Sequence, residues 1–346
     1  MSRRRVVLVT GIAGFIGYHL GRRLLREGNR VVGVDDLNGY YDPSLKKARL
    51  SKLERCGDLV FAQQDISEQN ATVELFDKYE PNVIVHLAAQ AGVRYSLEDP
   101  NSYVRSNVIG FHNILEGCRS MLNSGRHVEH LVYASSSSVY GGNSEYPYRV
   151  SAMTDRPLSL YAATKKSTEL FAYCYSRLYG IPTTGLRFFT VYGPWGRPDM
   201  AYFSFTERMV RGEAIQIFNN GDMRRDFTYV DDIVEGVTRV IDGPPCEDSI
   251  GVRHRVYNIG NSSAESLQYF VDTLESKLRL KGLISRPATR EYLPMQKGDV
   301  LETFADVSDL ERDFGFRPCT PLDQGLEMFV DWFSDYLKMK EDQSAP

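Results

Sequence analysis

Short apolar runs alternate along the chain with longer stretches in which apolar residues recur at helical spacing. The runs lie at residues 6–10, 31–34, 59–63, 83–87, 131–134 and 181–187. Runs of this length are typical of strands that are buried on both faces. Between them, residues 16–25, 73–79 and 103–122 repeat apolar positions every three or four residues, which predicts helices. The alternation predicts an α/β fold with a doubly wound parallel sheet.

The pattern changes after Arg187. Prolines and glycines crowd residues 192–198, so the regular alternation of strand and helix ends there. We therefore expect two domains. Residues 1–190 form the sheet domain, to which the chain returns around residues 228–262, and residues 191–346 form a smaller α/β domain.

A glycine-rich turn joins the first predicted strand to the first predicted helix. Gly11, Gly14 and Gly17 follow residues 6–10, and the second strand ends in Asp35. Glycines allow the backbone to approach a pyrophosphate closely, and a helix N-terminus offers its N–H groups and positive dipole end to that anion. An acid about 20 residues further on accepts hydrogen bonds from the adenosine ribose and repels a 2′-phosphate. This unit predicts a dinucleotide site that prefers NAD to NADP.

Tyr161 and Lys165 are spaced to share one face of a predicted helix. A cation held beside a phenol lowers the phenol's pKa, so this pair can supply a base. Serines at positions 135–138 follow a buried strand, at the sheet edge where open α/β sheets bind ligands. The same Tyr and Lys spacing also occurs on ordinary amphipathic helices, but the dinucleotide pattern favours catalysis.

Composition and charge exclude several classes of protein. The chain has 346 residues, of which 42% are hydrophobic and 25% charged, as in ordinary globular proteins. Its net charge of -4 gives no electrostatic case for binding nucleic acid. No run approaches the roughly 18 apolar residues of a membrane helix. Five widely spaced cysteines without a CxxC pair predict reduced thiols, with neither disulfides nor a zinc site, so we expect a cytoplasmic protein without a metal.

Two further stretches carry a resemblance to a known family. With the GxxGxxG turn, residues 189–194 (Phe-Thr-Val-Tyr-Gly-Pro) and 225–232 (Arg-Asp-Phe-Thr-Tyr-Val-Asp-Asp) resemble the nucleotide-sugar epimerase branch of the extended short-chain dehydrogenases/reductases. The resemblance covers nearly the whole chain and implies a Rossmann fold with a smaller substrate domain. Residues 195–201 (Trp-Gly-Arg-Pro-Asp-Met-Ala) are most similar to UDP-glucuronate 4-epimerases.

The resemblance implies a bound NAD. The residues that it places on the cofactor are Gly11, Gly14, Phe15, Ile16, Gly17, Asp35, Asp65, Ile66, Leu87, Ala88, Ala89, Asn107, Tyr161 and Lys165. The small residues at 88–92 are also consistent with a tight packing turn. His86 lies within a strand and is interpreted as a buried core histidine.

The resemblance also implies a UDP-sugar substrate. Tyr161 matches the catalytic base and Lys165 its partner, while Ser136 and Ser138 are two candidates for the hydroxyl that assists them. Thr190 and Arg197 match a cradle for the hexuronate carboxylate, although Arg197 is also consistent with a surface loop. The full set of implied substrate residues is Ser136, Ser137, Ser138, Tyr161, Thr190, Arg197, Ile217, Phe218, Arg225 and Asp299.

Within that set, four residues match the UDP site. Ile217 and Phe218 occupy the uracil position, Arg225 the diphosphate position and Asp299 the uridine ribose position. One departure concerns the diphosphate, because Gln296 stands where galactose epimerases carry a second phosphate-binding arginine. The second anchor of the diphosphate is therefore not identified from the sequence.

These matches predict C4 epimerisation of UDP-glucuronate to UDP-galacturonate through a 4-keto intermediate. The alternatives are a UDP-glucose/UDP-galactose 4-epimerase, a UDP-glucuronate decarboxylase and an NAD-binding sensor or scaffold without chemistry. A dehydratase would carry an Asp-Glu pair where Ser137 and Ser138 stand.

The helix at 103–122 and the helix that bears Tyr161 resemble the pair of helices that forms the dimer interface in this superfamily. The resemblance predicts a homodimer. Packing in the core of one chain explains the apolar residues on one side of the helix at 103–122 equally well.

Overall fold

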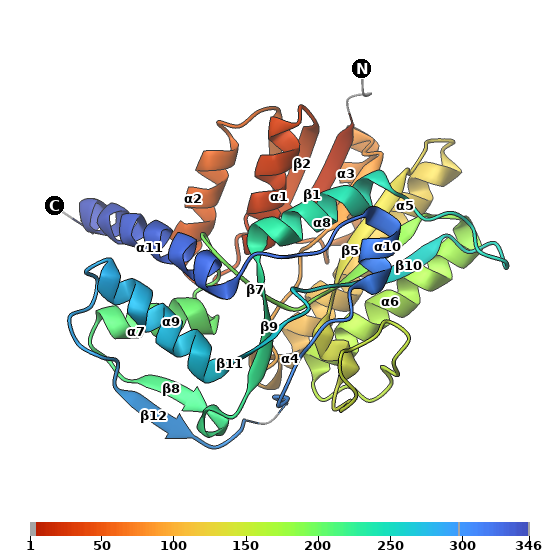
Figure 1. Cartoon of the computed structure of the whole chain (residues 1–346). Coiled ribbons are helices and arrows are strands. Elements are labelled where there is room, and N and C mark those ends of the chain that lie inside the picture. The colour runs from red at the N-terminus through yellow and green to blue at the C-terminus, as the bar shows by residue number, and fades with distance from the viewer. Residues whose placement is uncertain (1–4, 297, 345–346) are drawn as a thin grey trace.

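A seven-stranded parallel sheet forms the centre of the larger part of the molecule (Figure 1). The computed structural model describes residues 5–296 and 298–344. The strand order is β3-β2-β1-β4-β5-β6-β10, and every neighbouring pair is parallel. The predicted doubly wound sheet is therefore confirmed. Its strands are β1 (Val6–Thr10), β2 (Arg30–Asp35), β3 (Leu59–Gln63), β4 (Val83–His86), β5 (His130–Ser136), β6 (Thr183–Phe188) and β10 (His254–Ile259).

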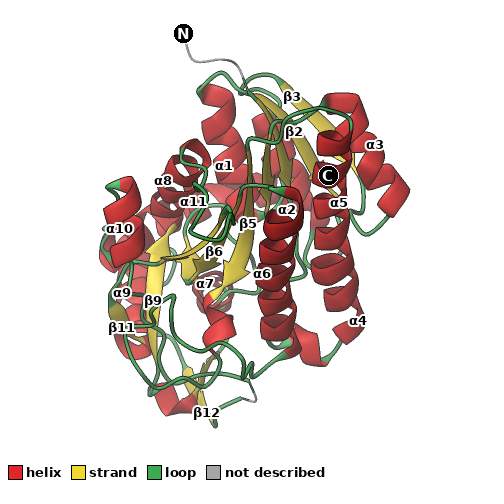
Figure 2. Ribbon diagram, turned by 90° about the vertical axis from the view of Figure 1, so that its right-hand side faces the viewer, coloured by secondary structure: helices red, strands yellow, loops and turns green. Residues whose placement is uncertain are grey.

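Helices cover both faces of this sheet (Figure 2). Successive side chains of a strand point to opposite faces, so Val7 and Val9 enter one core and Leu8 enters the other. The core around Leu8 lies under α3, α5 and α6, and the core around Val7 lies under α1, α2 and α8. These helices are α1 (Phe15–Arg26), α2 (Pro43–Leu53), α3 (Gln69–Tyr79), α5 (Gly110–Asn123), α6 (Leu160–Tyr179) and α8 (Val230–Asp242).

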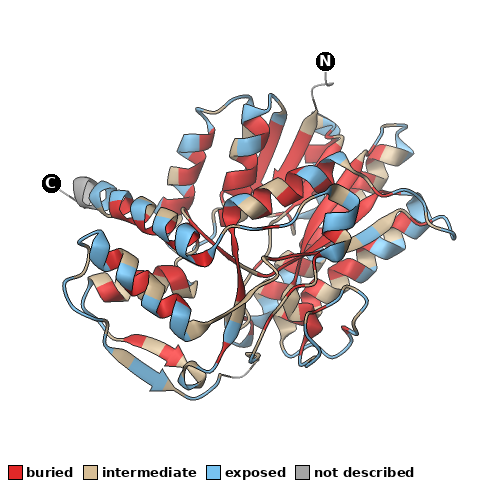
Figure 3. Cartoon of the chain, viewed as in Figure 1, coloured by how far each residue is buried: buried red, intermediate tan, exposed pale blue. Residues whose placement is uncertain are grey.

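The smaller part of the molecule is built from residues that follow β6 and contains two small sheets. One sheet has the order β11-β9-β7 and the other pairs β12 with β8. Buried aromatic residues such as Phe203, Phe270 and Phe329 extend the core around Val7 into this part (Figure 3). The elements are β7 (Thr190–Tyr192), α7 (Ala201–Val210), β8 (Ile215–Phe218), β9 (Arg224–Tyr229), β11 (Ala264–Ser266), α9 (Leu267–Leu280), β12 (Arg290–Leu293) and α11 (Leu322–Ser344). Helix α10 (Ser308–Phe314) returns to the larger part, where it packs against β10.

Two helical segments differ from the prediction. The expected helix at 103–122 consists of α4 (Pro100–Tyr103), a π-helical segment η2 (Val104–Ile109) and α5. Helix α2 was not predicted, although Asp42 caps its N-terminus by accepting a hydrogen bond from the Ser44 N–H and Pro43 follows directly. This Asp-Pro pair is the start signal that the periodicity alone does not show.

The structure also bears on the predictions for His86, the cysteines, membrane helices and metal sites. His86 is buried in β4 and shares a hydrogen bond of 2.9 Å with the Thr10 hydroxyl, as expected for a core histidine. All five cysteines are free thiols. Among residues 5–296 and 298–344 there is no helix that is long and apolar enough to cross a membrane, and no cluster of His, Cys, Asp and Glu that could hold a metal ion.

Candidate active site

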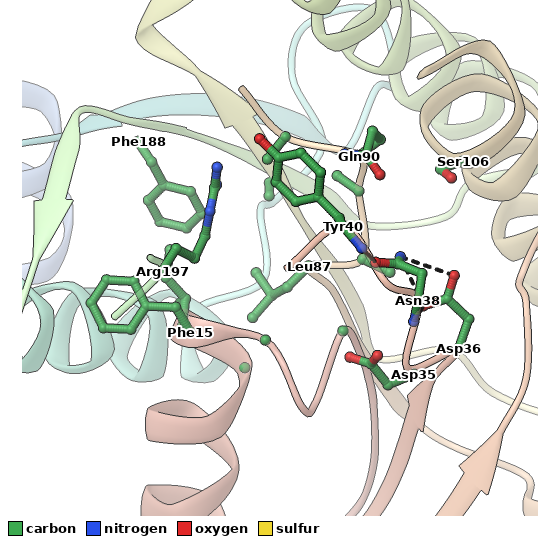
Figure 4. A pocket seen from close by; sticks show the side chains of 18 of the residues that line it. Phe15, Asp35, Asp36, Asn38, Tyr40, Leu87, Gln90, Ser106, Phe188 and Arg197 are labelled. Carbon is green, nitrogen blue, oxygen red and sulfur yellow. Dashed lines mark hydrogen bonds between the residues drawn. The ribbon is translucent and has the colours of Figure 1, made fainter. Parts of the chain in front are cut away.

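A cleft opens at the carboxyl ends of the central strands. Figure 4 shows Asp35, Asp36 and Asn38 at one end of it and Phe188 and Arg197 at the other. The glycine turn, the loop after β4, the end of β5 and the start of α6 all contribute to its lining. The predicted site residues that line the cleft are Gly11, Gly14, Phe15, Ile16, Gly17, Asp35, Asp65, Ile66, Leu87, Ala88, Ala89, Ser136, Tyr161, Lys165 and Arg197.

The glycine turn has the geometry that a dinucleotide needs. Gly11 has φ +71°, and a Cβ added to it would lie 2.8 Å from the Ala88 nitrogen. A Cβ on Gly17 would lie 2.0 Å from the Gly11 carbonyl oxygen. No side chain caps the N-terminus of α1, so its N–H groups are open to an anion. The turn therefore accepts only glycine at these positions and fits the pyrophosphate of NAD.

Asp35 lies at the end of β2, where an adenosine ribose would meet it. It accepts hydrogen bonds from the backbone N–H groups of Ala13, at 3.1 Å, and Leu37, at 2.9 Å. Burial raises the pKa of its carboxyl, and the ammonium of Lys46, 3.7 Å away, acts in the opposite direction. Lys46 comes from α2 and was missed by the sequence analysis. The Lys46 ammonium gives the buried Asp35 carboxylate a positively charged partner.

Asn107 does not line the cleft, in contrast to the prediction of a direct cofactor contact. Its side-chain oxygen accepts a hydrogen bond of 2.8 Å from the Gln90 N–H, and its amide donates to the Gln90 carbonyl and to the Thr164 hydroxyl, both at 3.0 Å. Asn107 is fully buried in η2. It fixes the loop after β4 against α6, so we assign it a positioning role.

Tyr161 and Lys165 lie in the first turns of α6, whose N-terminus Ser159 caps by accepting a hydrogen bond from the Ala162 N–H. The Lys165 ammonium donates to the Ala134 carbonyl at 2.8 Å. Burial lowers the pKa of Lys165 to about 8. Burial also raises the pKa of Tyr161, against the Ser136 hydroxyl and the Arg197 charge. Burial therefore outweighs the effects of the Ser136 hydroxyl and the Arg197 charge on the pKa of Tyr161, and Lys165 is not among the groups that lower it.

Replacing Lys165 by methionine is expected to raise the free energy of unfolding at pH 7 by up to about 3 kcal/mol, while abolishing activity. The unfolded lysine has a pKa of 10.5 and the folded one about 8, so the folded chain pays for the buried charge below about pH 8. The unfolded chain binds the extra proton between these values, so the penalty falls as the pH rises toward 10.5. Thermal unfolding at pH 7 and pH 10 measures this difference.

The neighbouring Lys166 provides a matched control. It is partly exposed and pairs with Glu169 at 3.3 Å. Methionine at position 166 is therefore expected to leave stability nearly unchanged at both pH values. An equal gain from both substitutions would contradict the burial argument.

The four serines at the end of β5 and directly after it have different surroundings. Ser135 lines the cleft, but its hydroxyl donates a hydrogen bond of 2.7 Å to Glu169, which does not line it. Ser136 lines the cleft, and its hydroxyl favours the Tyr161 phenolate. Ser137 and Ser138 do not line the cleft, but the Ser136 and Ser138 hydroxyls lie 3.2 Å apart. This geometry favours Ser136 as the partner of Tyr161, with Ser138 behind it.

Arg197 faces the cleft and is not on an outer surface loop. Its side chain is 21% exposed, and its charge is close enough to lower the pKa of Tyr161. The guanidinium donates to both carboxylate oxygens of Asp199, at 3.0 Å from Nε and 2.5 Å from Nη2. Thr190 begins β7 and does not line the cleft. The Arg197 guanidinium therefore lies on the side of the cleft where Tyr161, the predicted base, lies.

Residues 7–260 match the model of the NAD dependent epimerase/dehydratase family. The matched span contains the glycine turn, Asp35, the four serines and helix α6, which bears Tyr161 and Lys165. The chain belongs to this family. It is an NAD-dependent nucleotide-sugar epimerase, as the relatives of known activity also indicate.

Known members of the family align over nearly the whole epimerase chain. Protein CapI of Staphylococcus aureus is 48% identical over 343 residues, which are 96% of this chain and 99% of CapI. UDP-glucuronate 4-epimerase 2 of Arabidopsis thaliana is 46% identical over 344 residues, covering 96% of this chain and 76% of that protein. The crystal structure of UDP-glucuronic acid 4-epimerase from Bacillus cereus, in complex with UDP-glucuronic acid and NAD, superposes with a TM-score of 0.84 at 32% identity, covering 96% and 99% of the two chains.

A second cluster of the epimerase contains the residues predicted for UDP. Arg225 lies in β9, and its Nη1 and Nη2 groups donate to the carbonyl oxygens of residues 224, 300 and 301 at 2.7 to 3.0 Å. Asp299 and Phe218 lie nearby, because both contact the side chain of Arg94. Ile217 is fully buried in the core, so its side chain points away from the surface where Arg94 contacts Phe218.

Arg94 was not predicted from the epimerase sequence. Its guanidinium lies 4.4 Å from the centre of the Phe218 ring and 3.2 Å from the Asp299 carboxylate. The side chain is 52% exposed. Burial lowers the pKa of Arg225, and the charge of Arg94 acts in the same direction. Arg94 is therefore a second cation in the cluster that contains Arg225 and Asp299.

Arg49 of α2 is another residue that the sequence analysis missed. It is fully buried, and its guanidinium donates to the carbonyl oxygens of Ala13, Trp195 and Gly196 at 2.7 to 3.1 Å, and to the Tyr41 hydroxyl at 2.6 Å. It thus joins the glycine turn of the epimerase to the turn that precedes Arg197. Trp195 has φ +59°, a backbone conformation that these bonds help to hold.

Proposed function

We propose that this epimerase interconverts UDP-glucuronate and UDP-galacturonate. The observation that carries the proposal is Arg197, a guanidinium in the cleft whose charge acts on the predicted base Tyr161. A neutral sugar needs no cation at this place, whereas a carboxylate pairs with a guanidinium fork. The similarity to the Arabidopsis and Bacillus UDP-glucuronate epimerases supports the same substrate.

Tyr161 is the base of the proposed reaction. Its phenolate takes the proton from the sugar O4, and the Ser136 hydroxyl, which favours that phenolate, donates a hydrogen bond to O4. NAD, when bound, supplies hydride chemistry, by accepting the hydride of C4 and returning it. The product of the first half is a 4-keto sugar. When this sugar turns over, C4 receives the hydride on its opposite face while the Tyr161 hydroxyl returns the proton to O4.

The UDP stays in place while the sugar turns. In our proposal Asp299 accepts from the uridine ribose, and Arg225 and Arg94 face the diphosphate from two sides. Phe218 packs against the uracil. Because Nη1 and Nη2 of Arg225 hold residues 224, 300 and 301, Arg94 has the more accessible of the two guanidinium groups.

Replacing Arg94 by glutamine is expected to weaken UDP binding by roughly 10-fold, because one charge-assisted contact is lost. The side chain is half-exposed, so the substitution leaves the core intact. Calorimetric titration with UDP gives the affinity. Arg126 is a matched control, since it is also a partly exposed arginine that pairs with acids, Asp77 and Glu80, outside the cleft. Equal UDP affinity in the wild type and the Arg94→Gln variant would exclude the diphosphate role.

The proposed activity is tested by incubating the purified protein with UDP-glucuronate and no added cofactor. Chromatography and proton NMR resolve the products. UDP-galacturonate without CO2 supports epimerisation by a retained NAD. A UDP-pentose with CO2 would make the protein a decarboxylase, and turnover of UDP-glucose alone would make it a neutral-sugar epimerase. No reaction, even with NAD added, would leave the binding-only alternative.

We also infer that two copies of the chain pair through the helices beside the cleft. Large apolar side chains are exposed on α6 at Leu170 and Leu178, and on η2 at Val104 and Ile109. Covering such side chains on a second copy removes apolar surface from water. Sedimentation of the wild type and a Leu170→Glu, Leu178→Glu variant tests the pairing. A dimeric wild type and a monomeric variant are expected.

A further inference from the structure

Arg197 is held by an acid that belongs to neither the cofactor site nor the UDP cluster. Asp199 follows two residues later and receives hydrogen bonds from Nε and Nη2 of Arg197. The Tyr40 hydroxyl donates a third hydrogen bond to Asp199, at 3.2 Å. Tyr40 comes from the loop after β2, next to Asp36 and Asn38 (Figure 4). The guanidinium is therefore fixed from two separate segments of the chain.

This arrangement leaves one edge of the guanidinium for a ligand. A guanidinium has five N–H groups in a fixed plane, and Asp199 occupies the edge formed by Nε and Nη2. No described residue accepts a hydrogen bond from Nη1, so the edge of the guanidinium that contains Nη1 is available for a second carboxylate. Because the plane is rigid, fixing one edge also fixes the direction of the other.

The loop after β4 makes room for this arrangement. Gly92 has φ +105°, and a Cβ added to it would lie 3.1 Å from the Tyr40 hydroxyl and 3.8 Å from Nη2 of Arg197. Tyr40 also contacts Tyr95, with ring centroids 4.8 Å apart. The hydroxyl that anchors Asp199 is thus held by its own aromatic contact, so the group formed by Tyr40, Asp199 and Arg197 is a packed unit.

We propose that Asp199 is a positioning residue that fixes the direction of Arg197 and thereby determines whether the 4-keto intermediate keeps its carboxylate. The proposal rests on the proposed function. The intermediate is a β-keto acid, which loses CO2 when its C5–C6 bond aligns with the C4 carbonyl π system. A carboxylate held by a fixed guanidinium stays out of that alignment, and one held by a guanidinium that rotates does not.

The competing reaction balances without any further reactant. The C5–C6 bond breaks, CO2 leaves, and the electron pair remains on C5 as an enolate conjugated with the C4 carbonyl. C5 then takes up one proton from water. The hydride that left C4 in the first step returns to C4, and O4 receives the proton from Tyr161. The products are CO2 and a UDP-pentose, and the oxidation state of the cofactor is restored.

The test is the product distribution of an Asp199→Asn variant given UDP-glucuronate. Asparagine keeps the size of the side chain and one acceptor oxygen but removes the charge and the second acceptor. We expect the ratio of UDP-pentose to UDP-galacturonate to rise at least about 10-fold over the wild type, while calorimetric affinity for UDP changes by less than about 2-fold. A variant that only loses overall rate, with no CO2, would overturn the proposal, because that is the result of a purely structural role.

Two further variants keep the test decisive. Tyr40→Phe removes only the hydrogen bond from the Tyr40 hydroxyl to Asp199, so it is expected to raise the ratio of UDP-pentose to UDP-galacturonate by a smaller factor. An unchanged ratio would contradict the role of Tyr40 in holding Asp199. Asp155→Asn removes an exposed acid that does not line the cleft, and it is expected to match the wild type. If the wild type itself does not convert UDP-glucuronate, the proposed function fails first, and the ratio has no bearing on Asp199.

Discussion

Replacing Tyr161 by phenylalanine is expected to lower kcat by roughly 10³-fold or more, because the substitution removes the only proton acceptor that the mechanism gives to O4. NAD should remain bound, since the glycine turn and Asp35 are unchanged. Product formation from UDP-glucuronate measures the first effect, and the absorbance and mass of the nucleotide released on denaturation measure the second.

A second tyrosine on the same helix serves as the control for this experiment. Tyr173 is exposed on α6 and does not line the cleft, so phenylalanine there should leave turnover unchanged. Near-normal turnover of the Tyr161→Phe variant would reject Tyr161 as the base. Loss of NAD from that variant would show that the phenol mainly supports the cofactor.

Replacing Arg197 by alanine is expected to weaken UDP-glucuronate binding by roughly 10- to 100-fold while leaving UDP binding within about 2-fold. The two ligands differ in the sugar and its carboxylate, and only the carboxylate needs the guanidinium. The loss of the Arg197 charge is also expected to change the pH dependence of the rate. Arg197 lowers the pKa of Tyr161, so its removal raises that pKa and should move the acid limb of the pH-rate profile to higher pH.

Lysine at position 197 separates charge from geometry. An ammonium keeps the positive charge but cannot form the two parallel hydrogen bonds of a guanidinium. This variant should therefore shift the acid limb less than alanine does, yet still bind UDP-glucuronate more weakly than the wild type. Equal losses of UDP and UDP-glucuronate affinity in both variants would refute the carboxylate role of Arg197.

The predicted site residues that line the cleft are mostly those whose sequence signals are local. A glycine turn between a strand and a helix, with Asp35 at the end of the next strand, is a pattern within one supersecondary unit. The same holds for Tyr161 and Lys165, which are neighbours on a single helix. The doubly wound parallel sheet follows from the alternation of strands and helices, because crossover connections leave few topologies.

The parts that escaped prediction depend on contacts between distant segments. Arg49 meets Trp195 across 146 positions, and Arg94 meets Asp299 across 205. No local pattern marks either partner. The direction in which a side chain points was also not predictable from the sequence. The sequence identifies Ile217 and Asn107 by residue type and by their neighbours. Only the packed structure shows that Ile217 enters the core and that Asn107 faces Gln90.

The carbonyl partners of Arg49 also bear on the order in which the chain can fold. This guanidinium is fully buried, yet three of its five hydrogen bonds go to the carbonyl oxygens of Trp195 and Gly196, which are synthesised long after α2. Leaving a buried charge without its partners costs roughly 3–5 kcal/mol. The predicted sheet domain, residues 1–190, therefore cannot reach its final packing during translation until the turn before Arg197 has left the ribosome. Completion of the glycine turn thus waits for the segment that we propose to contact the sugar.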